Sequence, residues 1–460
     1  MTKALKILGA LVCIVLVAGL FACGPTTKGQ VFRYQSDASV RALVAGAPAS
    51  YPSASFIVFS DAHLFSPSLG TTGPAFEEYL ANDRKLLVES TRIMDSLVAT
   101  ITQVKADFVL VSGDLTKDGE EVDHEVAASY LARIEASGKK VFVVPGNHDI
   151  MNPRASSYDA TGSKPVASVT PEQFTQIYQQ FGYGDALYRD ADTLSYVAEP
   201  VRGLWLLALD ACLYKQNPGR EESVTDGAFT PQTLSWIESR LIDAAKQNKA
   251  VIVMMHHNIS EHFTGEEKYF GEYIVDNYPE VSRLFAEYNA RLVFTGHYHA
   301  QDITLQRYSG GKYLFDIETG SLVTYPCPYR VVTLGGSSAG VRSGFITSIA
   351  GHETDFAQYA HTDIVDGVAS IATKAIEDFG VDSENALKLA TQVADAMVAH
   401  YAGDELLPAG QPAISAKGTG LKGFLVVFAR KGLLTGLWHD LPPADNGITI
   451  DLSDGSVASP

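Results

Sequence analysis

The sequence predicts an α/β protein in which buried strands alternate with helices, followed by a smaller helical domain. Short, continuous apolar runs such as Phe56–Phe59 and Phe108–Val111 are typical of strands that are covered on both faces. Between such runs, apolar residues recur at helical spacing, as at Leu86, Ile93 and Leu97. This alternation favours a layered α/β domain.

Four more buried strands and three further helices complete the predicted α/β domain, which we place at residues 51–350. The strands are expected at 141–144, 204–209, 251–255 and 292–294. The helices are expected at 121–134, 231–248 and 279–289. From about residue 301, shorter strands and turns replace the helices.

The pattern changes again after residue 350, where long helical periodicities replace the strands. Ile364, Val368 and Ile371 share one face of a helix, and two more apolar helical stretches follow. We therefore predict a small helical domain at residues 351–440 and a tail at residues 441–460.

Residues 1–22 have the character of a secretion signal. A short basic start and an almost wholly apolar stretch lead to Leu20-Phe21-Ala22-Cys23, which resembles the lipobox of bacterial lipoproteins. The resemblance implies that Cys23 is acylated, that residues 23–50 form a tether, and that the exported protein is anchored at the outer face of a bacterial membrane. The alternative is an uncleaved membrane helix, for which the apolar run is short.

Charge and cysteine content narrow the range of partners. The formal net charge is −18, and no run of Lys or Arg could build a basic groove, which argues against duplex nucleic acid as a partner. Beyond the leader only Cys212 and Cys327 remain, as a disulfide or as two free thiols. No cysteine pair has the spacing of a thiolate zinc site.

Five of the six strong strands run into residues that can bind a metal ion. In chain order the clusters are Asp61-Ala62-His63, Gly113-Asp114, Gly146-Asn147-His148-Asp149, His256-His257 and Gly296-His297-Tyr298-His299. Since the carboxyl ends of strands in open α/β sheets form the ligand-binding edge, we expect the clusters to converge. Each cluster alone could be a cap or a turn, but their order and placement favour a metal site. Imidazole, carboxylate and amide together suit Mn, Fe or Zn.

The order of these clusters resembles that of the calcineurin-like metallophosphoesterase family over about residues 55–305. The resemblance implies a four-layer α/β/β/α sandwich that holds two metal ions, Mn, Fe or Zn. For the first metal it implies the ligands Asp61, His63, Asp114 and His299. For the second metal it implies a bridging Asp114 together with Asn147, His256 and His297.

The resemblance also implies how such a site acts. Two metal ions clamp the phosphoryl group and activate a bridging water, and the resulting hydroxide attacks phosphorus. His148 is expected to protonate the leaving oxygen, and Asp149 is expected to orient His148. Purple acid phosphatases have a tyrosine three residues after the second cluster's aspartate, where this chain has Lys117, so their iron–tyrosinate centre is not expected.

The overall layout resembles that of lipoprotein-type class III cyclic-nucleotide phosphodiesterases, which add a helical C-terminal domain to the core. This implies hydrolysis of small phosphodiesters, in particular 3′,5′-cyclic nucleotides. The segment 262–278 holds Phe263, Tyr269, Phe270 and Tyr273 and is either ordinary loop packing or a lid that stacks a base. An insertion at 152–188 could also shape specificity. Two alternatives remain, an extracellular phosphomonoesterase or nucleotidase and a non-catalytic surface-binding lipoprotein.

Overall fold

Two seven-stranded β-sheets form the body of the protein, which a computed structural model describes for residues 30–459. The first sheet has the order β16-β15-β14-β13-β1-β2-β3, and the second has the order β11-β12-β10-β9-β8-β7-β6. The first sheet consists of β1 (Tyr51–Phe59), β2 (Phe108–Val111), β3 (Lys140–Val143), β13 (Pro328–Gly336), β14 (Ser338–Phe345), β15 (Gly447–Asp451) and β16 (Val457–Ala458). The second consists of β6 (Tyr188–Arg189), β7 (Tyr196–Val201), β8 (Leu204–Leu209), β9 (Ala250–Met255), β10 (Leu292–Thr295), β11 (Ile303–Arg307) and β12 (Tyr313–Glu318).

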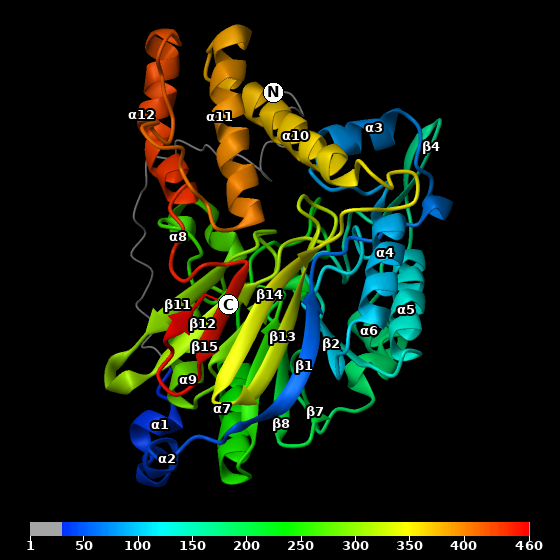
Figure 1. Ribbon diagram of the computed structural model, residues 1–460. Coiled ribbons are helices and arrows are strands. Elements are labelled where there is room, and N and C mark those ends of the chain that lie inside the picture. The colour runs from blue at the N-terminus through cyan, green and yellow to red at the C-terminus, as the bar shows by residue number, and fades with distance from the viewer. Residues whose placement is uncertain (1–29, 460) are drawn as a thin grey trace.

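The two sheets pack face to face, and helices cover the outer face of each (Figure 1). Between the sheets, the ring of Phe56 on β1 lies 5.2 Å from the ring of Phe294 on β10. The helices that cover the two sheets are α4 (Ser90–Gln103), α5 (Glu121–Glu135), α7 (Pro231–Lys246) and α9 (Tyr278–Glu287). The predicted α/β fold with four layers is therefore confirmed, and all six predicted buried strands are present.

Three long helices stand at one end of the two-sheet body (Figure 1). They are α10 (Phe356–Asp378), α11 (Ser383–Ala402) and α12 (Gly420–Leu437). Phe263 and Tyr298 from the body are buried in the same apolar core as the inner faces of these helices. The predicted C-terminal helical region is confirmed. Within residues 30–459 no helix has both the length and the apolar character that crossing a bilayer requires.

The expected C-terminal tail is wrong. Residues 441–460 supply β15 and β16, and β15 pairs antiparallel with β14 at the edge of the first sheet. Ile448 and Ile450 face the core, while the residues between and beside them are more exposed. With only two buried apolar residues, the alternation in β15 is too short to indicate a strand by itself.

The expected tether is also partly folded. Its later part forms α1 (Arg33–Ser36) and α2 (Ala38–Val44), which lie against α7. The backbone N–H groups of Arg33 and Tyr34 donate to the carboxylate of Glu238 on α7, at 2.9 and 3.1 Å. Cys212 and Cys327 are free thiols. The predicted signal at residues 1–22 and the predicted lipidation site lie outside the described residues.

Several short elements complete the fold. They are α3 (Pro74–Ala81), the hairpin of β4 (Ser156–Asp159) and β5 (Gly162–Pro165), α6 (Pro171–Ile177) and α8 (Glu266–Phe270). The hairpin and α6 lie in the insertion at 152–188, and α8 lies in the aromatic segment at 262–278. Both segments that were expected to shape specificity are therefore ordered parts of the fold.

Candidate metal centre

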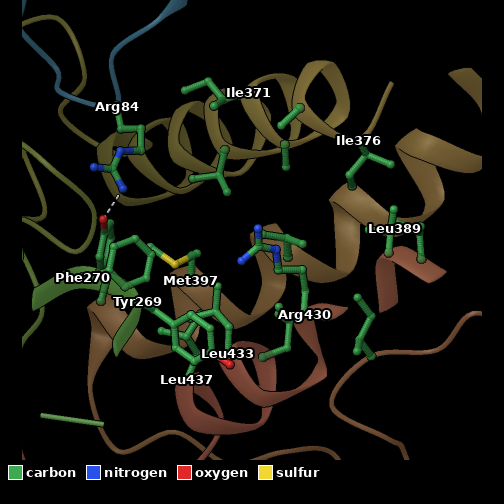
Figure 2. A pocket seen from close by; sticks show the side chains of 18 of the residues that line it. Arg84, Tyr269, Phe270, Ile371, Ile376, Leu389, Met397, Arg430, Leu433 and Leu437 are labelled. Atoms are coloured by element: carbon green, nitrogen blue, oxygen red, sulfur yellow. Dashed lines mark hydrogen bonds between the residues drawn. The ribbon is translucent and has the colours of Figure 1, made fainter. Parts of the chain in front are cut away.

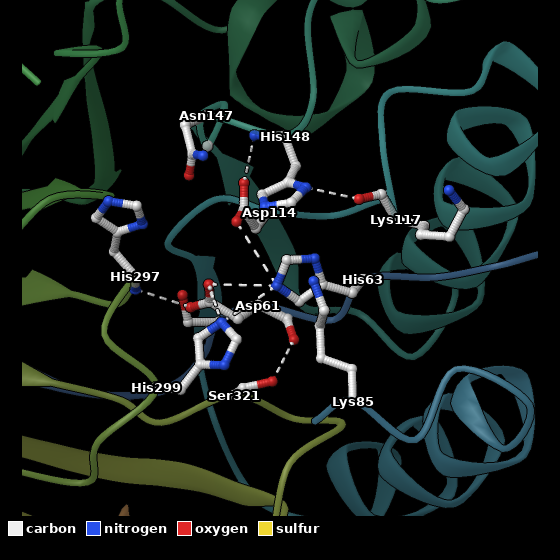
Figure 3. A network of polar contacts seen from close by, with 12 residues as sticks. Asp61, His63, Lys85, Asp114, Lys117, Asn147, His148, His297, His299 and Ser321 are labelled. Atoms are coloured by element: carbon white, nitrogen blue, oxygen red, sulfur yellow. Dashed lines mark hydrogen bonds and ion pairs between the residues drawn. The ribbon is translucent and has the colours of Figure 1, made fainter. Parts of the chain in front are cut away.

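The five predicted clusters meet at the carboxyl edge that the two sheets share, and Figure 3 shows residues of four of them. Three clusters follow the parallel strands β1, β2 and β3 of the first sheet, and two follow the parallel strands β9 and β10 of the second. Parallel pairing directs these strand ends the same way, which places polar side chains from both sheets in one cleft. The cleft is therefore built from the residues expected to bind metal.

The first group of candidate ligands consists of Asp61, His63 and His299. The Oδ1 atom of Asp61 lies 3.3 Å from Nε2 of His299 and 3.7 Å from Nε2 of His63. Nε2 of His63 also lies 3.6 Å from Oδ2 of Asp114. With metal–ligand bonds of about 2.0–2.2 Å, one ion could contact all of these atoms.

The second group consists of Asp114, His256 and His297. Nε2 of His256 lies 3.4 Å from Oδ2 of Asp114 and 3.2 Å from Oδ1 of Asn147. Nδ1 of His256 lies 2.8 Å from the carbonyl oxygen of Ser112, and this hydrogen bond leaves Nε2 free to bind a metal. Asp114 is close to both groups, so its carboxylate can bridge two ions.

Many of the candidate ligands lie on left-handed backbone, which is uncommon for residues other than glycine. The φ angles are 52° at Asp61, 36° at His63, 48° at Asp114, 80° at His297 and 73° at His299. Each such residue costs about 1–3 kcal/mol, and strain of this kind clusters at functional sites. Close approach of the loops adds to the constraint, since a Cβ atom on Gly146 would lie 2.0 Å from Oδ1 of Asp114.

Burial and neighbouring charge set the protonation of the ligands. Burial lowers the pKa of His63 and of His297 well below the ordinary value, which favours the neutral imidazole that binds metals. Burial alone would raise the pKa of Asp114, but His256 and His148 outweigh it, and the pKa lies well below the usual range. In these three residues the neutral imidazoles and the ionised carboxylate are the forms that metal binding requires. His256 differs, because Asp114 and Asp61 outweigh burial and raise its pKa to about 9.

His148 lies at the edge of the two groups and is oriented by an unexpected partner. Its Nδ1 atom lies 2.7 Å from the carbonyl oxygen of Lys117 and 3.0 Å from Oδ1 of Asp118. Burial lowers the pKa of His148, but Asp114 and Asp118 raise it by more, and the net shift is upward. An imidazolium held beside the cleft can donate a proton or a hydrogen bond to a leaving oxygen.

The role predicted for Asp149 is therefore wrong. Its carboxylate accepts the backbone N–H groups of Gly146 at 2.8 Å and of Thr116 at 3.0 Å, and it is fully buried. It ties together the loops after β2 and β3, because buried backbone donors in such turns need an acceptor. Asp118 is the carboxylate that positions His148. The sequence indicates this role only weakly, through the presence of an acidic residue four positions after Asp114.

Residues outside the five clusters give the cleft its shape and charge. The cleft has a volume of about 430 Å³, and both basic and acidic side chains line it. Lys85 pairs with Asp83 at 3.3 Å and Arg154 pairs with Glu222 at 3.6 Å, which leaves Arg84 as the basic lining residue without a carboxylate partner in the described part of the chain. Ser156 and Tyr158 line it from the hairpin of the insertion at 152–188. The insertion was one of two segments expected to shape specificity, and the structure places it against the metal ligands.

The aromatic segment is divided between different environments. Tyr273 lines the cleft, with its ring 4.6 Å from the ring of His297. Phe263 is fully buried beneath the helical region, and Phe270 lines a separate apolar space. Tyr269 also lines that apolar space, so of the four aromatic residues considered for stacking a base only Tyr273 lines the cleft.

A match to a protein-family model agrees with this geometry. Residues 54–301, more than half of the chain, match the family model described as calcineurin-like phosphoesterase. Similar solved structures include a dimetal phosphatase from Danio rerio (15% identity, 64% of this chain and 96% of that chain, TM-score 0.46) and a purple acid phosphatase from yellow lupin (13%, 67% and 53%, 0.39). No curated protein matches the chain. With the family model covering most of the α/β body, the chain belongs to the calcineurin-like phosphoesterases, a family of metal-dependent phosphoester hydrolases.

Proposed function

We propose that this protein hydrolyses phosphodiesters at a binuclear metal centre, with 3′,5′-cyclic nucleotides as the candidate substrates. The observation that carries the proposal is the place of Asp114 between two groups of ligands, with His148 beside them. A metal pair bound there would supply positive charge to the phosphoryl group and activate a water for attack. Mn, Fe and Zn all suit the donor set of imidazole, carboxylate and amide.

The residues of the chain itself would complete the reaction. Arg84 and Lys85 line the cleft and can hold the phosphoryl oxygens, while His148 faces the leaving oxygen and donates a proton to it. Asp118 keeps the His148 ring in that orientation through Nδ1. The backbone N–H of His148 donates to Oδ1 of Asp114 at 2.9 Å. This hydrogen bond fixes the loop that carries His148 relative to Asp114, the ligand that both metal ions would share.

Two features of the cleft support cyclic nucleotides. Its volume of about 430 Å³ lies within the range of roughly 300–1,000 Å³ that small-molecule sites occupy. Tyr273 presents an aromatic ring next to His297, where a base attached to a bound phosphate could stack. A phosphomonoesterase or nucleotidase is the second candidate, because a bound metal pair with Arg84 beside it would attract a dianionic monoester.

A substrate panel tests the proposal. We would measure kcat/KM with added Mn²⁺ for cyclic AMP, a 2′,3′-cyclic nucleotide, AMP, bis-p-nitrophenyl phosphate and p-nitrophenyl phosphate. We expect every diester to exceed AMP, and cyclic AMP to be the best nucleotide. A higher value for AMP than for all diesters would replace the proposal with the nucleotidase function, and no turnover of any ester would leave a binding protein.

Two aromatic variants test where the base lies. We expect Tyr273→Ala to lower kcat/KM for cyclic AMP by about tenfold or more, since stacking is worth about 1–3 kcal/mol per base. Phe270→Ala is the matched control, because Phe270 belongs to the same segment but does not line the cleft. Equal effects of the two variants on cyclic AMP would remove Tyr273 as the stacking residue.

We also propose that the protein is exported and anchored through acylated Cys23, as the lipobox-like sequence indicates. In a bacterial host, Cys23→Ser should release the protein from membranes or leave an unprocessed precursor. The measurement is partitioning between detergent and aqueous phases together with the mass of the N-terminal peptide. Normal processing and unchanged detergent partitioning of the variant would reject the anchor.

A further inference from the structure

An apolar chamber of about 320 Å³ lies between the three C-terminal helices and the aromatic segment (Figure 2). Helices α10, α11 and α12 supply aliphatic walls that include Val368, Ala372, Leu389, Met397, Leu434 and Leu437. Protein interiors are close-packed and hold few voids larger than a water molecule. A space of this size with apolar walls is therefore of the kind that binds a ligand.

The chamber adjoins the metal cleft. Arg84 and Tyr273 line both spaces, and they are the residues at the boundary. Arg84 is fixed there by a hydrogen bond from its guanidinium to the hydroxyl of Tyr401 (Figure 2). A ligand in the chamber would thus contact a wall of the cleft.

One cation in the chamber has no partner. Arg430 of α12 extends its guanidinium among the apolar side chains (Figure 2), and its Nε atom is buried without a hydrogen bond. Throughout the described part of the chain, residues 30–459, no carboxylate pairs with it, and α12 itself contains no acidic residue. Arg430 as a whole is partly exposed, so the rest of its guanidinium is open to pair with an anionic group on a ligand.

The outer face of α12 suits the same kind of ligand. Leu421, Phe424, Leu425 and Phe428 recur at helical spacing and are 75%, 55%, 54% and 77% exposed. Lys422 and Lys431 flank them in a chain that is otherwise strongly acidic. A helix with an exposed apolar stripe and basic neighbours is typical of one that lies at the surface of an anionic lipid layer. Such a layer is a source of anionic amphiphiles.

We infer that the chamber binds the hydrocarbon chain of a single-chain anionic amphiphile, whose anionic group pairs with Arg430. Fatty acids and lysophospholipids share this chemistry. Because Arg84 and Tyr273 border both spaces, an amphiphile in the chamber changes the KM of the metal cleft for its substrate. Binding itself does not depend on the proposed diesterase activity and is measured without turnover.

The binding experiment uses the chain from residue 23 onward with Cys23→Ser, which keeps all of the described residues 30–459. Oleate, lysophosphatidylglycerol and neutral monoolein are titrated below their critical micelle concentrations by calorimetry. We expect saturable binding of one anionic amphiphile per chain, at least about tenfold tighter than monoolein, because hydrogen bonds to charged groups contribute about 1.5–3 kcal/mol. Comparison of oleate with lysophosphatidylglycerol shows whether the site prefers a carboxylate or a phosphate head group.

Chain length gives a second signature. Saturated carboxylates of eight to sixteen carbons should bind about fourfold more tightly per added methylene, as transfer of each methylene from water predicts, until the chamber is full. Affinity that does not change with chain length, or the absence of saturable binding, would overturn the inference.

Paired variants locate the ligand. Ala372→Phe places a ring inside the chamber and should abolish binding, whereas Ser370→Phe, on the exposed side of the same helix, should not. Arg430→Gln should remove the preference for oleate over monoolein, whereas Lys431→Gln, which removes an exposed charge next to it, should preserve that preference. Unchanged binding in both Ala372→Phe and Arg430→Gln would place the ligand elsewhere and overturn the inference.

Hydrolysis of bis-p-nitrophenyl phosphate separates this inference from the proposed function. All four variants should retain kcat, and saturating oleate should change the KM of the wild-type chain but not that of Ala372→Phe. Turnover without amphiphile binding would reject the chamber ligand alone. Amphiphile binding without turnover of any ester would reject the proposed function alone.

Discussion

The metal cleft and the apolar chamber are neighbours that share Arg84 and Tyr273, yet they are built in opposite ways. The cleft collects charged and polar side chains from the ends of five strands, on loops whose backbone is strained and tightly packed. The chamber is formed by ordinary aliphatic residues on the inner faces of three helices. Metal binding in the cleft depends on the position of a few atoms, whereas ligand binding in the chamber depends on its volume.

This difference teaches how far a sequence can indicate a site. Residue types such as His and Asp at strand ends have no structural reason to recur, so five clusters in order are informative. Aliphatic residues at helical spacing are expected in any helix that packs on a core, so the same pattern carries no information about an unfilled space. The two spaces should also respond differently to substitution.

The largest expected effect is the loss of the metal centre. Asp114→Ala removes the carboxylate that both ligand groups share, so metal content should fall from two ions per chain to below one, and kcat/KM for bis-p-nitrophenyl phosphate should fall by more than about 10³-fold. Elemental analysis and steady-state kinetics measure the two changes. Oleate binding to the chamber should persist in this variant, and full metal content with normal turnover would refute the assignment of the centre.

A smaller effect is expected from the loss of His148, the proposed proton donor. His148→Asn should retain both metals and lose about 10²-fold or more in kcat for an ester with a poor leaving group. The loss should be smaller for p-nitrophenyl esters, because p-nitrophenolate needs little protonation. The ratio of the two losses is the measurement, and equal losses would remove the acid role.

Asp118 and Asp149 should separate positioning from loop support. Asp118→Asn should lower kcat by about tenfold, with the same dependence on the leaving group as His148→Asn, because it removes the charged one of the two acceptors of Nδ1 of His148 and leaves only neutral ones. Asp149→Ala should instead lower the melting temperature and the metal content, because it leaves backbone N–H groups of the loops without an acceptor. A leaving-group dependence in Asp149→Ala but not in Asp118→Asn would restore the original prediction.

The smallest expected effect concerns pH and His262, a buried residue of the aromatic segment that lines neither space. Burial lowers the pKa of the His262 imidazole, but Asp316 and Asp302 raise it by more, and it lies well above its ordinary value. Its stabilising contribution is complete below the unfolded pKa of about 6.5 and is lost as pH rises through the folded pKa. The melting temperature of the wild-type protein should therefore fall between pH 7 and pH 9, and that of His262→Gln should fall less. Histidines with lowered pKa are neutral in both states over this range and do not contribute.

The fold and the ligand convergence could be predicted because both rest on patterns that repeat along the chain. The partner of His148 could not be predicted from the sequence. Asp149 is its neighbour in the chain, and only the structure shows that Asp118 faces the imidazole while Asp149 faces the backbone of the loops. The strand β15 was also missed, because a short edge strand is specified by its pairing with β14 more than by its own sequence. Similarly, the aromatic segment looks like a single feature in the sequence. In the fold, Phe263 is buried, Phe270 lines only the chamber and Tyr273 also lines the cleft.

The left-handed backbone at the metal centre limits how the site could be transplanted. A designer who grafted the same seven side chains onto the edge of a regular sheet would supply the right atoms on backbone that points them elsewhere. At Asp61, His63, Asp114, His297 and His299 the turn itself aims the side chain. A working copy would begin with the loops and the close contact at Gly146, and would add the ligands last.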